Sequence, residues 1–140
     1  MRITFYLFLC LSLFLGCASD PNSTLPHVNG YWEIEQVELA NGQVKEYTYS
    51  QNIDYFELNK NSNGFRKKVR PKLDGTFETS NDLARVVAKI ENDSLHLYYT
   101  NEYDSWKETV LDADAESLSI INEDRNIYTY KRHQPTKIDR

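Results

Sequence analysis

Short runs of alternating apolar and polar residues occupy most of the chain beyond residue 30. The clearest is Leu83–Glu91, in which Ala84, Val86, Ala88 and Ile90 alternate with mostly polar positions. Alternation with a period of two is typical of a strand that buries one face. No stretch shows a sustained helical period of apolar residues. The pattern therefore predicts an all-β protein.

Turn signals divide these runs into nine or ten predicted strands. Asn41-Gly42, Asp74-Gly75 and Asn92-Asp93 are typical hairpin dipeptides. The predicted strands are Tyr31–Leu39, Val44–Tyr49, Ile53–Leu58, Phe65–Leu73, Thr76–Ser80, Leu83–Glu91, Leu95–Tyr103, Trp106–Asp112, Ser117–Ile121 and Ile127–Arg132. Residues 82–85 could instead form a short helical turn. Because the connections are short, neighbouring strands should pair antiparallel, in either a sandwich or a barrel.

The first sixteen residues have the composition of an export signal. Met1-Arg2 is positively charged, and Ile3–Leu15 is a run of thirteen uncharged residues. A positive end, an apolar run of this length and small residues after it are typical of a secretory signal peptide. A membrane-spanning helix needs about 20 apolar residues, so a permanent span is the weaker interpretation. We predict that residues 1–16 are a signal peptide.

The segment Leu13-Phe14-Leu15-Gly16-Cys17 resembles the lipobox of bacterial lipoproteins, although Phe14 stands where that motif usually has leucine. The resemblance implies cleavage before Cys17 and acylation of this residue, with chains such as palmitate, as a membrane anchor. An internal disulfide is excluded for the mature chain, because Cys10 would leave with the signal peptide. The residue after the cysteine is Ala18, not aspartate, which favours the outer membrane of the cell envelope.

The mature chain would be acidic and rich in aromatic residues. Only one of the 16 basic residues lies in the signal peptide and none of the 21 acidic ones does, which leaves a net charge of −6. This charge argues against binding to nucleic acid and against electrostatic attraction to anionic lipid. We expect the lipidated cysteine and a flexible tether at 17–28, one domain at 29–133 and a polar tail at 134–140.

Two short motifs frame the predicted domain. Gly30-Tyr31-Trp32 opens its first strand, and Tyr128-Thr129-Tyr130-Lys131-Arg132 closes its last one. Both resemble the lipocalin-like domain found in exported bacterial lipoproteins. The resemblance implies a single antiparallel meander β-barrel of eight to ten strands, begun by Gly30 and plugged at one end by Trp32. It also implies that Arg132, or failing that Lys131, packs across Trp32. The alternative for Trp32 is an ordinary large core residue of any β fold.

A hollow barrel would offer a pocket for a ligand. The residues predicted to line it are Phe56, Phe65, Val86, Tyr99, Tyr103, Trp106 and Tyr128. An eight-stranded barrel is just wide enough to be filled by side chains or to hold one small ligand. Lys67 lies two residues after Phe65 and shares its face. It is therefore expected on the inner face, either as a counter-charge for a carboxylate ligand or near the rim.

The basic run Phe65–Lys72 allows two further interpretations. Alternation places its remaining basic residues on the outer face: Arg66, Lys68, Arg70 and Lys72. Charges and a proline on an exposed strand discourage pairing with other chains. The same charges could instead bind an acidic partner, such as an envelope polysaccharide or another protein.

The sequence contains no motif for catalysis or for metal binding. The spacing of His27, His96 and His133 is not that of zinc ligands. Asp112–Glu116 begins like a calcium loop but lacks the glycine required at the sixth position. There is no Gly-x-Ser-x-Gly segment, and no free cysteine would remain after processing. We therefore predict no enzyme activity, no cofactor and no metal.

Together these patterns predict a membrane-anchored lipocalin-like lipoprotein that binds a small, mostly apolar ligand in the bacterial cell envelope. The alternative is a filled barrel that acts as a structural module, or as an interaction module for protein or polysaccharide, at the membrane surface. The choice depends on whether the barrel is hollow, which alternation alone does not determine. The oligomeric state is left open.

Overall fold

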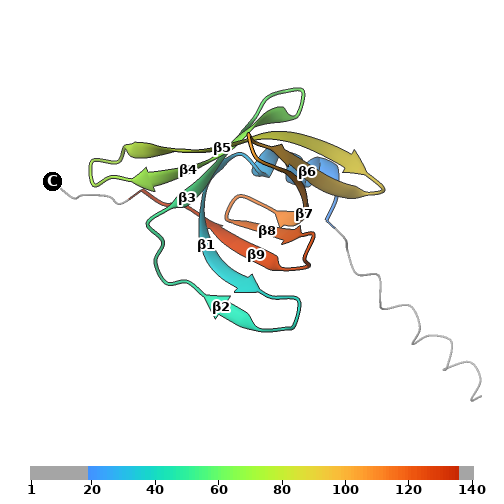
Figure 1. Cartoon of the computed structure of the whole chain (residues 1–140), viewed down its shortest axis with the longest axis horizontal. Coiled ribbons are helices and arrows are strands. Elements are labelled where there is room, and N and C mark those ends of the chain that lie inside the picture. Colours follow the sequence, from blue (N-terminus) through green and yellow to red (C-terminus); the bar gives the residue numbers. More distant parts are fainter. Residues whose placement is uncertain (1–18, 136–140) are drawn as a thin grey trace, which may run out of the picture.

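The computed structural model describes residues 19–135. The predicted signal peptide, Cys17 and most of the predicted tail lie outside these residues. The described strands are Gly30–Glu38 (β1), Val44–Glu46 (β2), Ile53–Leu58 (β3), Asn63–Pro71 (β4), Phe77–Glu91 (β5), Ser94–Thr100 (β6), Ser105–Ala113 (β7), Ser117–Asn122 (β8) and Ile127–Arg132 (β9). They are preceded by two short helices, Pro21–Thr24 (α1) and Leu25–His27 (η1) (Figure 1). None of the helices within 19–135 has the length and apolar character needed to cross a bilayer.

Eight of the nine strands close into an antiparallel barrel. The strands from β3 to β9 pair in chain order, and β1 pairs with both β3 and β9 to complete the circle. The extra strand, β2, pairs only with the second half of β1. The prediction of an all-β meander barrel is confirmed, and closure leaves few unpaired strand edges.

The predicted hairpin dipeptides lie in tight turns. Asn92 and Asp93 both have positive φ, at 50° and 61°, as a two-residue turn between twisted strands requires. Gly42 and Gly75 adopt φ of 88° and 84°, which disfavours residues that carry a Cβ. These local conformations are determined by residue type, which is why they could be predicted.

Several strand predictions need correction. The predicted strand Val44–Tyr49 ends at Glu46. Strand β5 runs without a break from Phe77 through Glu91 and so joins the predicted strands Thr76–Ser80 and Leu83–Glu91, and residues 82–85 form no helical turn. Lys67 pairs with Leu83 while Val69 pairs with Thr79, so three residues of β5 lie opposite one residue of β4. This bulge bends the strand without ending it.

The prediction of a flexible tether is wrong for residues 21–28. The carboxylate of Asp20 accepts a hydrogen bond from the backbone N–H of Asn22 at 3.0 Å and so caps α1. Thr24 is 5% exposed and Val28 is fully buried. Helices of four and three residues are too short to produce a periodic pattern, and their packing against the barrel was therefore invisible in the sequence.

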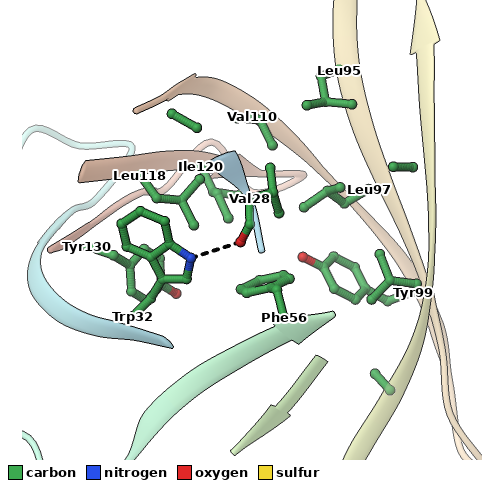
Figure 2. Close-up of a cluster of buried hydrophobic side chains, with 14 residues drawn as sticks. Val28, Trp32, Phe56, Leu95, Leu97, Tyr99, Val110, Leu118, Ile120 and Tyr130 are labelled. Atoms are coloured by element: carbon green, nitrogen blue, oxygen red, sulfur yellow. Dashed lines mark hydrogen bonds between the residues drawn. The ribbon is translucent and has the colours of Figure 1, made fainter. Parts of the chain in front are cut away.

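The interior of the barrel is filled at one end by large apolar side chains (Figure 2). Leu95, Leu97 and Tyr99 alternate along β6 and are at most 1% exposed. The other members of the buried cluster are Val28, Trp32, Phe56, Ala84, Val86, Ala88, Val110, Ala113, Leu118, Ile120 and Tyr130. Interiors packed in this way approach the density of organic crystals, so this part of the barrel has no room for a ligand.

A second aromatic cluster lies on the outer face of the sheet. The ring of Tyr31 is stacked between Tyr55, at 4.4 Å between centroids, and Phe77, at 4.2 Å. Phe65 meets Tyr55 edge-on, and His133 meets Phe77 in the same way. Phe77 begins β5, Tyr31 lies in β1 and His133 follows β9. The stack therefore packs the projecting β4–β5 hairpin (Figure 1) against the first and last strands of the barrel.

Strand β4 approaches β3 too closely at Gly64 for any side chain. A Cβ at Gly64 would collide with the backbone carbonyl of Glu57, whereas one at Gly42 would meet nothing within 4 Å. We expect Gly64→Ala to lower the free energy of unfolding by about 3 kcal/mol, because backbone cannot move aside as a side chain can. Urea unfolding followed by circular dichroism measures this change. Gly42→Ala, which only strains a turn, should lower the free energy of unfolding by about 1 kcal/mol. Equal losses of stability in Gly64→Ala and Gly42→Ala would contradict the steric argument.

Candidate functional site

One end of the barrel is closed by Trp32 and Arg132. Trp32 is fully buried, and its indole N–H donates a 2.9 Å hydrogen bond to the carbonyl of Val28 (Figure 2). The guanidinium carbon of Arg132 lies 3.9 Å from the centroid of the indole. The same guanidinium donates four hydrogen bonds to backbone carbonyls, at His27, Asn29, Asp114 and Ala115.

Gly30 and Arg132 depend on each other at this closed end. Gly30 has φ of 124°, and a Cβ there would collide with Nη1 of Arg132. A glycine at this position therefore leaves the space that the guanidinium occupies. The structure brings together the three residues that the lipocalin-like resemblance marked for closure: Gly30, Trp32 and Arg132. Lys131, the alternative lid, pairs instead with Glu33 at 3.7 Å on the outer face.

The predicted pocket-lining residues do not form one pocket. Phe56, Val86 and Tyr99 point inward but are at most 1% exposed, since they pack against each other and the rest of the core. Trp106 and Tyr128 are partly buried beside that core. The prediction for Tyr103 is wrong, because the residue is 90% exposed in the turn between β6 and β7. This strand ends at Thr100, before the alternation would have brought Tyr103 inside.

The inner and outer faces of β4 are the reverse of those predicted. Arg66 pairs with the buried Phe56, whereas Lys67 pairs with Tyr55 of the outer aromatic cluster. Phe65 and Lys67 therefore face outward, and Arg66 and Lys68 face inward. The prediction failed because it assigned the apolar residues of β4 to the inside. A period of two cannot detect a charged side chain that is buried with partners.

Arg66 is the centre of a buried ionic cluster in the other half of the barrel. Its Nε and Nη2 contact the two carboxylate oxygens of Asp54, at 3.3 and 3.2 Å. Nη1 donates to Glu108 and Nη2 donates to the hydroxyl of Tyr130, both at 3.2 Å. Lys68 adds a second cation to Asp54 at 2.9 Å. The guanidinium carbon also lies 5.1 Å from the ring centroid of Phe56. Two-point contact of this kind holds a guanidinium in one orientation.

The cluster shifts the pKa values of its members. Burial alone would raise the pKa of the Asp54 carboxyl, but the charges and hydrogen bonds of Arg66 and Lys68 outweigh it and lower the pKa below 3.8. Burial raises the pKa of the Tyr99 and Tyr130 hydroxyls, and the nearby Arg66 offsets only part of this effect. The Tyr99 hydroxyl is buried and has no hydrogen-bond partner within residues 19–135. At neutral pH the cluster therefore combines ionised Arg66 and Asp54 with protonated tyrosines.

A cavity of about 220 Å³ opens above this cluster. Its lining residues are Asp54, Arg66, Lys68, Asp82, Ala84 and Trp106. Two larger hollows, of about 710 and 740 Å³, lie beside it along the turn between β6 and β7. The larger hollow is lined mostly by exposed side chains and is a depression of the outer surface. The other is lined mostly by half-buried side chains, among them Trp106, and reaches the buried Tyr99, but it contacts none of the ionised groups of the cluster. The small charged cavity is the candidate functional site, because among the cavities formed by residues 19–135 it is the one that leads from solvent to the buried ionised groups.

A family model of the lipocalin-like domain matches residues 28–120. The chain belongs to the lipocalin-like domain family. The match begins at Val28, the residue that accepts the hydrogen bond of Trp32, and spans most of the barrel.

Two solved structures resemble this lipocalin-like barrel. A lipocalin-like protein from Bacteroides uniformis ATCC 8492 is 14% identical, with a TM-score of 0.50 over 76% of this chain and 99% of that one. An uncharacterized protein from Bacteroides eggerthii DSM 20697 is 11% identical, with a TM-score of 0.48 over 75% of this chain and 98% of that one. At these identities the first likeness shows the fold alone. No curated protein matches the sequence.

The charged residues inside the lipocalin-like barrel were not expected there, and Arg66 and Lys68 were predicted on the outer face. These charged residues are Asp54, Arg66, Lys68 and Glu108, together with the hydroxyl of Tyr130. Asp54 and Lys68 pair directly across β3 and β4, and Phe56 and Arg66 form the next inward pair. Opposite charges at inward positions of neighbouring strands were the available signal, but only the strand register shows that they are neighbours. Among residues 19–135 no cluster of side chains is suited to hold a metal ion.

The lowered pKa of Asp54 makes part of the stability depend on pH. Its carboxylate contributes stability above its pKa in the unfolded chain, and this contribution is lost as the pH falls through the lower folded-state pKa. We expect wild-type protein to lose stability between about pH 6 and about pH 3, and Asp54→Asn to lose clearly less over the same range. Urea unfolding at both pH values measures the difference. Asp124→Asn, at an exposed position, should behave like wild type, and an unchanged pH dependence in Asp54→Asn would refute the assignment.

Proposed function

We propose that this lipocalin-like protein is a lipid-anchored protein of the bacterial cell envelope that binds a small ligand in the cavity above Arg66. The observation that carries the proposal is a solvent-connected cavity lined by ionised side chains in a barrel that is otherwise filled. Buried charges are costly, and replacing them by apolar residues often leaves a fold as stable or more so. A buried Arg66 beside an accessible cavity therefore favours a role in binding.

The free hydrogen-bond donors of the cavity suggest the chemistry of the ligand. Arg66 uses four of its five N–H groups on partners within residues 19–135, and Lys68 uses one of three on Asp54. Lys68 is 45% exposed at its side chain and can turn toward a bound molecule. The indole of Trp106 adds a flat apolar wall. This combination fits a molecule with a carboxylate for the two cations and a ring or short apolar part for Trp106.

The size of the cavity limits the ligand further. A volume of about 220 Å³ corresponds to roughly seven water molecules at about 30 Å³ each, which admits a molecule of about ten non-hydrogen atoms. A long acyl chain would need the space that Phe56, Tyr99 and Val86 fill. We therefore propose a compact carboxylate in place of the mostly apolar ligand that the aromatic composition favoured.

Benzoate is a suitable probe for this site, with benzamide as its uncharged analogue. We expect saturable binding of benzoate, seen as a change in Trp106 fluorescence, and weaker binding of benzamide. Lys68→Gln should weaken benzoate binding about tenfold, because a charged hydrogen bond is worth about 1.5–3 kcal/mol. Ala84→Leu should abolish it by filling the cavity. The measurement uses the mature protein purified in detergent, together with native mass spectrometry for any ligand that co-purifies.

Lys67→Gln is the matched control for Lys68→Gln. Lys67 is the neighbouring basic residue but faces the outer surface, so its loss should leave benzoate binding unchanged. Equal effects of the two substitutions would show that only the general charge of the surface matters. Absence of both benzoate binding and a co-purified ligand would contradict a ligand-binding role.

A second candidate function is an interaction module with a filled barrel. It is favoured by the tight core, in which ten large side chains are less than 2% exposed. In that case the cluster at Arg66 would serve to fix the strand register. The benzoate experiment separates the two candidates, because the module needs no accessible cavity.

Lipidation at Cys17 is proposed from the lipobox-like sequence at residues 13–17. We expect metabolic labelling with an alkyne analogue of palmitate to mark the wild-type protein and not Cys17→Ala. The variant should also leave the membrane fraction, because several acyl chains are needed for stable attachment. Ser19→Cys, with its thiol two residues away, is not expected to restore labelling in Cys17→Ala. Label that persists in Cys17→Ala would contradict the anchor.

A further inference from the structure

The chain that leads to the proposed anchor is held against the closed end of the barrel. The hydroxyl of Ser19 donates a 2.9 Å hydrogen bond to the carboxylate of Asp112, near the end of β7. Thr24 and Val28 are buried, and Arg132 binds the carbonyls of His27 and Asn29. From Ser19 onward the segment is therefore part of the folded domain.

Strand β7 gives the distance between this attachment and the cavity. Asp112, which binds Ser19, lies six residues from Trp106, which lines the cavity. At about 3.4 Å per residue the two positions are about 20 Å apart along the strand. The attachment and the cavity thus lie at opposite ends of the barrel.

We propose that the closed end of the barrel faces the anchoring bilayer and that the cavity faces away from it. The inference rests on the proposed lipidation of Cys17. Two Cα–Cα steps separate Cys17 from Ser19, so the acylated residue lies within about 8 Å of the closed end. Even if Ser19 and Asp20 detach, four steps to Pro21 span at most about 15 Å, less than the length of β7 between the two ends.

Surface chemistry alone would favour the reverse orientation. Tyr49 and Tyr103, at 78% and 90% exposed, lie in the β2–β3 and β6–β7 connections at the cavity end, and exposed tyrosines suit a membrane interface. The closed end carries Asp20, Asp114 and Glu116, which anionic lipid repels. The short connection overrides both preferences, because an anchored Cys17 cannot reach the cavity end while α1 and η1 stay packed.

This orientation determines where a ligand comes from. A cavity that faces away from the bilayer exchanges its ligand with the aqueous compartment, which suits the compact carboxylate proposed above. A cavity that faced the bilayer would instead be suited to taking lipid from it. Tyr49 and Tyr103 then lie on the surface that a soluble ligand or partner meets first.

Two turns at the ends of β7 provide a matched pair of probe positions. Glu116 lies between β7 and β8 at the closed end, and Glu102 lies between β6 and β7 at the cavity end. Both side chains are exposed. Since the mature chain has no thiol other than Cys17, Glu116→Cys and Glu102→Cys can each be labelled with one environment-sensitive fluorophore. The acylated proteins are then placed in phosphatidylcholine vesicles that carry a short-range quencher on the lipid headgroup.

We expect about threefold or stronger quenching at position 116 than at position 102, because the two turns are separated by about the length of β7. Equal quenching, or stronger quenching at 102, would overturn the proposed orientation. Palmitate-analogue labelling of the same samples shows whether the anchor is present. Its absence would contradict the lipidation proposal itself, which distinguishes the two failures.

A linker variant tests the cause of the orientation. Twelve Gly/Ser residues inserted between Ala18 and Ser19 would span roughly 20 Å as a flexible chain, enough to let the barrel turn over. We expect the difference between positions 116 and 102 to collapse in this variant while acylation is retained. A difference that survives the linker would show that the surface sets the orientation, contrary to the proposal.

Discussion

Arg132 binds backbone carbonyls that come from separate parts of the chain. Its guanidinium holds His27 and Asn29, which lead into β1, and also the turn between β7 and β8, while it covers the indole of Trp32. Charged hydrogen bonds are worth about 1.5–3 kcal/mol each, and an unpaired carbonyl beside a buried indole would be costly. This one side chain therefore joins the last strand to the first strand and to the segment before it. Gly30, Trp32 and the packing of α1 and η1 all depend on it.

A second arginine organises the opposite half of the barrel with different chemistry. Arg132 satisfies neutral carbonyls at the surface of a packed core, whereas Arg66 is held by carboxylates inside the barrel. The hydrogen bonds of Arg132 to backbone carbonyls complete the packed core and leave no space for a ligand there. The arrangement at Arg66 keeps ionised groups next to a cavity that is open to solvent. The barrel is thus filled and fixed around Trp32, and it carries ionised groups beside a cavity in the other half, which adjoins the closed end where Trp32 pairs with Asp54.

Several features followed from residue type and could be predicted. Alternation along Leu83–Glu91 marked a strand, and Asn92-Asp93 marked the turn after it, because these patterns depend on neighbours in sequence. Gly30 and Trp32 indicated closure through a family resemblance, and the lipocalin-like fold is shown by the match to residues 28–120. By contrast, α1 lay within a predicted tether, since a single turn of helix leaves no periodic trace. Tyr103 was assigned to the interior because the end of β6 could not be located.

The candidate site at Arg66 could not be predicted from the pattern of apolar residues. That pattern placed Phe65 and Lys67 inside and Arg66 outside, because alternation groups Lys67 with apolar Phe65 and leaves Arg66 on the opposite face. In the folded chain Arg66 is surrounded by Asp54, Glu108 and Tyr130, which are 12 to 64 residues away in sequence. The sequence by itself determined the strands, the tight turns and the net charge, because these depend on single residues and near neighbours. Only the tertiary structure decided which face of β4 is inside, because the register of distant strands determines whether a charge is buried alone or among partners.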